Sequence, residues 1–195
     1  MKNFLRNFLY TAVVFAVMTI PAWSFADKDA DTKINSLYAA NKLDDAFNTI
    51  LSVPQEMRTP LQWTIMGNIM SDYGNKSDAE FMYKSALNVD PKYYKALYNL
   101  GNLYMENGQP NMAVEYYKQV VKYHKEFAYG YYNLGCAYLK LGEYKKARNA
   151  FLDATYFNNH EPDFYYNLAY AYKKLNNEKS AKLYLGYYNK LMENK

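Results

Sequence analysis

The chain has 195 residues, of which 50% are hydrophobic and 22% charged, so it can bury a core and is not expected to be disordered. Its 8 Gly and 6 Pro are too few for a turn-rich β-sandwich or a collagen-like chain, and a single Cys excludes an internal disulfide and a CxxC zinc site. A formal net charge of +4 does not indicate nucleic-acid binding. The chain is rich in tyrosine, with 24 residues. A tyrosine side chain combines an apolar ring with a polar hydroxyl, so it suits a surface that is partly exposed to solvent.

Residues 1–26 have the pattern of a cleaved secretory signal peptide. Lys2 and Arg6 precede an uncharged stretch, Pro21 breaks it, and Ser24 and Ala26 place small residues before a cut after Ala26. We therefore expect a bacterial exported protein, periplasmic or secreted, with no membrane span after cleavage. The alternative is an uncleaved N-terminal membrane anchor, since the uncharged stretch is about long enough to span a bilayer.

From residue 60 onward, one pattern recurs every 34 residues, which divides the chain into the units 60–93, 94–127, 128–161 and 162–195. A small residue recurs at the eighth place, a turn residue at the fifteenth and Ala at the twentieth. These positions are Gly67, Gly101, Gly135 and Ala169; Gly74, Gly108, Gly142 and Asn176; and Ala79, Ala113, Ala147 and Ala181. Such a fixed period is typical of a repeat protein.

Each unit is predicted to hold two helices. In the first unit, Trp63, Met66, Gly67 and Met70 fall on one helical face. Gly74 then suits the left-handed residue that ends a helix. The small residues at the eighth and twentieth places are expected where two helices cross closely, with a large side chain filling the groove beside them.

These units resemble tetratricopeptide repeats, and the runs Leu97–Tyr104 and Tyr131–Gly135 are close to that family's pattern. The resemblance implies an all-α fold, a right-handed superhelical solenoid of stacked helix-turn-helix repeats. It also implies a non-enzymatic scaffold for protein–protein interaction. Residues 27–59 carry a weaker version of the pattern, with Asn41 at the turn, and are predicted to form a degenerate N-terminal repeat.

No catalytic or metal-binding motif emerges, so we expect no enzyme activity and no cofactor or metal. His124 and His160 lie near predicted helix ends and are expected to be solvated. The run 27–31 lacks the Gly and Glu of a calcium loop and is interpreted as a solvated terminus. Cys136 is interpreted as a small buried side chain rather than a reactive thiol.

In proteins that this chain resembles, the first helix of each unit lines a concave groove. The residues predicted there are Tyr98, Asn99, Asn102, Tyr132, Asn133, Tyr166, Asn167 and Tyr170. Rows of Tyr and Asn suit an extended peptide, so the expected partner is another protein or peptide, with no nucleic acid. We expect Tyr132 to be the central anchor and to contribute little to the helix stack, with Tyr116 on the outside.

Three other interpretations of these residues remain open at the level of sequence. The Tyr and Asn rows can serve only to pack the solenoid. A Tyr-rich groove can also bind carbohydrate or peptidoglycan. Finally, exposed Tyr on the end helices can make a self-assembling homo-oligomer.

Overall fold

The computed structural model describes residues 23–193, which form α-helices and one short 3-10 helix, with no strand in this part of the chain. The helices are α2 (Trp23–Ala39), α3 (Leu43–Leu51), η1 (Gln55–Met57), α4 (Pro60–Asp72), α5 (Lys76–Val89), α6 (Tyr94–Glu106), α7 (Pro110–Tyr123), α8 (Ala128–Lys140), α9 (Tyr144–Phe157), α10 (Pro162–Lys174) and α11 (Glu178–Glu193). Most of the predicted signal segment lies outside the described residues, and its predicted cleavage point falls within α2.

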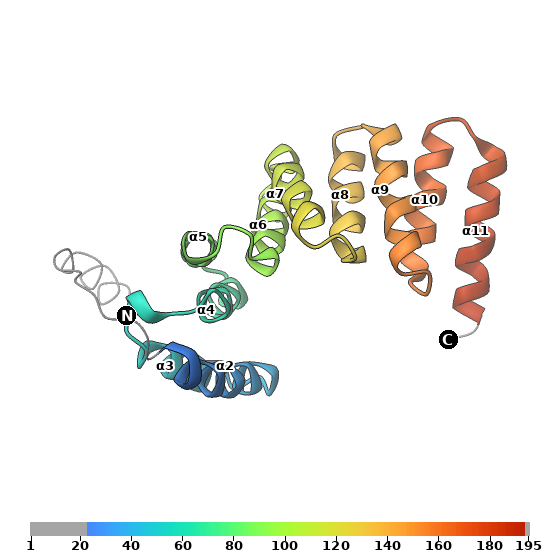
Figure 1. The fold of residues 1–195 in the computed structure, drawn as a ribbon. Coiled ribbons are helices and arrows are strands. Elements are labelled where there is room, and N and C mark those ends of the chain that lie inside the picture. Colours follow the sequence, from blue (N-terminus) through green and yellow to red (C-terminus); the bar gives the residue numbers. More distant parts are fainter. Residues whose placement is uncertain (1–22, 194–195) are drawn as a thin grey trace.

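The helices stack in chain order as antiparallel pairs, and each pair packs on the next (Figure 1). The helix axes turn progressively along the stack, from α2 at one end to α11 at the other (Figure 1). One core cluster runs through the stack, from Ile34 on α2 to Ala171 on α10. The all-α solenoid predicted from the sequence is therefore the observed architecture.

The turns between paired helices fall at the predicted residues. Gly74, Gly108 and Gly142 have φ of 75°, 70° and 73°, and Asn41 and Asn176 have φ of 57°. Positive φ costs glycine little, and asparagine tolerates it better than most residues. These five positions thus reverse the chain between the two helices of each pair.

The small residues at the eighth places lie where the two helices of a pair approach most closely. A Cβ built on Gly67 would lie 2.6 Å from Cδ1 of Tyr83, and one on Gly101 would lie 2.7 Å from Cδ1 of Tyr117. On Gly135 it would meet Phe151 at 2.7 Å. Each of the three aromatic rings is buried against the glycine backbone of its partner helix. The predicted close crossings are confirmed at these positions.

Partly buried hydrogen bonds connect the first helix pair to the start of α4. Asp31 Oδ1 accepts hydrogen bonds from Thr59 Oγ1 at 3.0 Å and from Gln62 Nε2 at 2.8 Å. Thr59 also caps α4, because its hydroxyl oxygen accepts from the Gln62 backbone N–H. The prediction that the acidic run belongs to a solvated terminus is wrong for Asp31, which supports a fully buried Gln62.

Candidate functional site

Hydrogen bonds join the first helices of successive pairs, and most of the predicted groove residues take part. Asn99 Nδ2 on α6 donates to Asn68 Oδ1 on α4 at 2.6 Å. Asn133 Nδ2 on α8 donates to Asn102 Oδ1 at 2.9 Å and to the Tyr98 hydroxyl oxygen at 3.0 Å, both on α6. The asparagine row is thus a set of cross-links between neighbouring first helices, which we call the amide ladder (Asn68, Asn99, Asn102, Asn133 and Asn167).

The last rung of the amide ladder joins α8 to α10 in a different way. Asn167 Nδ2 donates to the Tyr132 hydroxyl oxygen at 2.8 Å and to the backbone oxygen of Asp163 at 3.2 Å. The place equivalent to Asn102 is Cys136 in this unit, so no amide oxygen is available there. The tyrosine hydroxyl therefore serves as the acceptor across this interface.

The second helix of each of two successive pairs also forms a hydrogen bond with the amide ladder, at equivalent positions. Tyr83 on α5 donates to Asn68 Oδ1 at 2.9 Å, and Tyr117 on α7 donates to Asn102 Oδ1 at 2.6 Å. In the next pair the aromatic residue is Phe151, which has no hydroxyl, and the residue at the place equivalent to Asn68 and Asn102 is Cys136. Loss of the donor thus coincides with loss of the acceptor, so neither polar group is buried without a partner.

Tyr132, the predicted central anchor, is partly buried and built into the stack. Its ring stacks on Phe164 with centroids 4.8 Å apart and an interplanar angle of 26°, and it also contacts Phe151. Burial is the main cause that raises the pKa of Tyr132 above its usual range. The expectation that this ring contributes little to the helix stack is therefore wrong.

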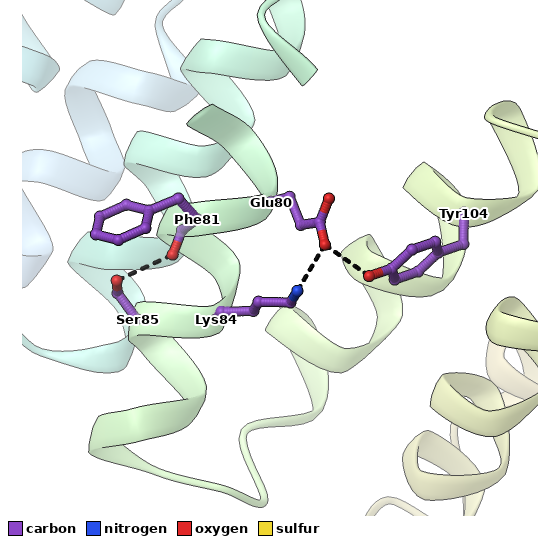
Figure 2. A network of polar contacts seen from close by, with 5 residues as sticks. All are labelled: Glu80, Phe81, Lys84, Ser85 and Tyr104. Carbon is purple, nitrogen blue, oxygen red and sulfur yellow. Dashed lines mark hydrogen bonds and ion pairs between the residues drawn. The ribbon is translucent and has the colours of Figure 1, made fainter. Parts of the chain in front are cut away.

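Tyr116, expected to lie on the outside, is also packed against another ring. It stacks on Tyr104 with ring centroids 5.3 Å apart and an interplanar angle of 11°. Tyr104 in turn donates to Glu80 Oε1 at 2.6 Å, and Lys84 Nζ donates to the same oxygen at 2.6 Å. Figure 2 shows both side chains pointing toward the Glu80 carboxylate. These two hydrogen bonds are the main causes that lower the pKa of the Glu80 carboxyl. Tyr116 is thus part of the packing between α5, α6 and α7.

Tyr166 and Tyr170 are the predicted groove residues with the greatest exposure, at 51% and 42%. The ring of Tyr166 contacts Tyr188 on α11, and Lys174 Nζ lies 5.4 Å from the ring centre of Tyr170. Both rings present polar and apolar surface at the C-terminal end of the row. They are available for contact with another molecule.

A hollow lies at the other end of the row, between α2, α4 and α6. It has two adjoining compartments of about 250 and 300 Å³, which share Tyr38, Asn68 and Asn99. The first also contains Asn102, and the second contains Tyr98. The structure therefore brings Tyr98, Asn99 and Asn102 together around one cavity, whereas none of the other five predicted residues lines it.

Sequence reasoning missed the contribution of α2, which adds Asn35 and Tyr38 to the hollow. These residues precede the regular repeats, so the 34-residue alignment assigns them no groove position. The pairing of Asn35 and Tyr38 at i and i+3, one face of a helix, is the signal that was available.

The structure contradicts the expected exposure of His124, whereas Cys136 is partly buried and has little thiolate character. His124 is partly buried, and its ring lies 4.1 Å from that of Tyr94 and 5.8 Å from that of Phe127, so the prediction of a solvated side chain is wrong. His160 is exposed. Cys136 is partly buried, and burial raises the pKa of its thiol to about 11, which disfavours the reactive thiolate.

Within residues 23–193, no three His, Cys, Asp or Glu side chains gather where they could hold a metal ion. In the same range, no helix is both long enough and apolar enough to cross a membrane.

Comparison with known proteins agrees with this architecture. A family model described as tetratricopeptide repeat matches residues 98–159 and again 132–189. The chain carries tetratricopeptide repeats over residues 98–189. This fold is a scaffold for protein–protein interaction. A search of curated proteins finds no match to the chain.

Several solved structures share the fold. MamA from Desulfovibrio magneticus RS-1, residues 41 to the end, is 19% identical, with a TM-score of 0.75 over 89% of this chain and 99% of that one. A structure titled as the crystal structure of MamA is 20% identical, with a TM-score of 0.73 over 83% and 95%. MamA of strain AMB-1 is 18% identical, with a TM-score of 0.72 over 86% and 92%. At these identities the likeness concerns the fold alone.

Proposed function

We propose that this chain is a non-enzymatic scaffold that binds an extended segment of a partner protein on its concave face. The observation that carries the proposal is the hollow between α2, α4 and α6, which is lined by tyrosine, asparagine and apolar side chains together with a few charged ones. Tyr and Asn offer flat contact surface together with adaptable donors and acceptors. The exposed Tyr166 and Tyr170 extend this surface toward the C-terminal end.

The hollow favours a peptide over a sugar. A sugar ring stacks on the face of an exposed aromatic side chain, ideally between coplanar rings. In the hollow, Tyr98 and Phe127 meet edge to face at 78°, so neither ring is paired in parallel with the other. The nearly coplanar pairs elsewhere, such as Tyr104 with Tyr116, stack on each other. A peptide backbone with separate side chains fits the two compartments better.

Filling the hollow is the direct test. Asn35 is exposed on α2 and lines the second compartment, so Asn35→Trp adds bulk there without removing a buried group. With a partner captured from an envelope extract on the immobilised chain, we expect this variant to bind at least tenfold more weakly, about 1.4 kcal/mol. Affinity is measured by calorimetry with the purified partner.

Asn88→Trp is the matched control, because Asn88 is an exposed helical asparagine on α5 that does not line the hollow. It should bind the partner as the parent chain does. Equal affinities for the two variants would contradict binding at the hollow.

We also propose that the scaffold acts outside the cytoplasm of a bacterium, on the basis of Lys2, Arg6, Pro21 and the small residues before Asp27. The expected product of the intact gene in its host is a chain beginning at Asp27. Intact-mass measurement of the protein from the envelope fraction checks this. A mass that includes residues 1–26 would instead support an uncleaved membrane anchor.

A further inference from the structure

The two compartments of the hollow differ in chemistry. The first contains the carboxylates of Asp72 and Glu106, beside Ser71 and the hydroxyl of Tyr83. The second contains more apolar and aromatic side chains, namely Leu61, Ile65, Tyr94, Tyr98 and Phe127, beside the polar Asn35, Thr64 and Lys95. Because they share Tyr38, Asn68 and Asn99, one extended chain can place neighbouring side chains in both.

The position of the two carboxylates in their helices is unusual. Asp72 is the last residue of α4 and Glu106 the last of α6, where the helix dipole disfavours a negative charge by about 0.3–1 kcal/mol. The equivalent residues of α8 and α10 are Lys140 and Lys174, which the same dipole favours. Helix stability therefore does not account for the acidic residues, whereas a cation bound in the hollow would be attracted by both carboxylates and by the two helix ends.

The negative charge of Asp72 extends over the walls of the first compartment. Burial is the main cause that raises the pKa of both Tyr38 and Tyr83, and the charge of Asp72 contributes to the rise in each. Asn99 also lines this compartment, and because its Nδ2 group donates to Asn68, its amide oxygen is the atom that can accept from a ligand. Carboxylate and carbonyl oxygens are the partners that an ammonium or guanidinium group requires.

The protein's own cations compete only weakly for these carboxylates. Lys76 Nζ lies 3.0 Å from Glu106 Oε2, but both side chains are about half exposed, and such pairs contribute little. Among the described residues, no cation forms an ion pair with Asp72. Lys95 lines the second compartment and not the first. The first compartment is thus a local acidic site on a chain whose formal net charge is +4.

We propose that the hollow selects a basic side chain, Lys or Arg, followed or preceded by an apolar one, in an extended segment of the partner. The basic group lies in the first compartment against Asp72 and Glu106. The apolar side chain lies in the second, against Tyr98 and Phe127. This inference rests on the proposed function and specifies the chemistry of its ligand.

Three labelled peptides test the selectivity: acetyl-Ser-Lys-Phe-Ser-Lys-Phe-Ser-amide, and the same sequence with Gln or with Glu in place of Lys. We expect fluorescence anisotropy to show the Lys peptide binding at least tenfold more tightly than the Glu peptide, with the Gln peptide between them. The net positive charge of the chain would favour the opposite order through long-range attraction, so this order requires the local acidic site.

The double variant Asp72→Asn, Glu106→Gln keeps the size of both side chains. It should bind the Lys peptide at least tenfold more weakly and should no longer discriminate among the three peptides. Glu115→Gln with Glu193→Gln changes the net charge equally at two exposed positions outside the hollow, and it should retain the selectivity. Circular dichroism on each variant confirms that the helices are intact.

The possible failures are distinguishable. If the three peptides bind equally well, and Asn35→Trp weakens all of them, the groove function stands and the charge selectivity is overturned. If the Lys peptide binds the double variant as tightly as the parent, the assignment to Asp72 and Glu106 is overturned. If the Lys peptide does not bind at 1 mM, a limit of about −4 kcal/mol, the proposed selection of a basic side chain is also overturned. The affinity of Asn35→Trp for the captured partner tests the groove function separately.

Discussion

Gly101→Leu is expected to destabilise the protein by about 3 kcal/mol, at the upper end of the usual cost of overpacking. Even the first added carbon would lie 2.7 Å from Cδ1 and 2.8 Å from Cζ of Tyr117, a ring that is 1% exposed and cannot swing away. The clash would also displace the Tyr117 hydroxyl from Asn102. Urea unfolding followed by circular dichroism measures the change in free energy.

Gly186→Leu provides the matched control, because Gly186 is also a helical glycine but a Cβ there meets no described atom within 4 Å. Leucine is a better helix former than glycine by about 0.8 kcal/mol. The Gly186 variant should therefore be as stable as the parent or slightly more stable. Similar losses in both variants would mean that Gly101 does not lie at a close helix crossing.

Tyr132→Ala is expected to cost about 3 kcal/mol, as for other large aromatic truncations in packed sites. The ring stacks on Phe164 across the interface between α8 and α10, and its hydroxyl accepts from Asn167 across the same interface. Its loss removes both contacts and leaves the Asn167 amide with only the Asp163 backbone oxygen. The free energy of unfolding in urea checks the size of the loss.

Tyr166→Ala makes the same substitution at the equivalent place of the next unit. Tyr166 is 51% exposed, and its ring contacts Tyr188 alone among the described aromatic rings. We expect a loss below about 1 kcal/mol, since most surface substitutions change stability little. If both variants lose equal stability, the stacking of Tyr132 on Phe164 does not stabilise the interface.

The regular part of the fold is predictable because a position that is ambiguous in one repeat can be assigned from the equivalent positions of the others. Four copies of one pattern locate the turn residues and the small residues, and the structure confirms the turns at Gly74 and its equivalents and the close crossings at Gly67, Gly101 and Gly135. Each of these positions is set by a local requirement, positive φ or a close helix crossing, which few residue types satisfy, glycine first among them. The sequence therefore predicts these features unit by unit.

The groove is less predictable, because its residues are assigned by what they contact on other helices. The sequence places Tyr98, Tyr132 and Tyr166 at equivalent positions, yet Tyr132 is packed on Phe164 and Tyr166 is exposed. The difference comes from neighbours: Tyr132 is followed by another helix pair, whereas Tyr166 faces only the last helix. Likewise, Asp31 becomes a structural acceptor only when Thr59 and Gln62 fold beside it.

Site-specific photo-crosslinking most directly tests whether the hollow is where the partner binds. A photoreactive phenylalanine derivative replaces Asn35, beside the hollow, or Asn88, away from it, in the chain expressed in its host. The adducts formed on irradiation are then resolved by mass. Binding at the hollow predicts one discrete partner adduct from position 35 and none from position 88. An adduct from position 88 with none from position 35 would contradict it.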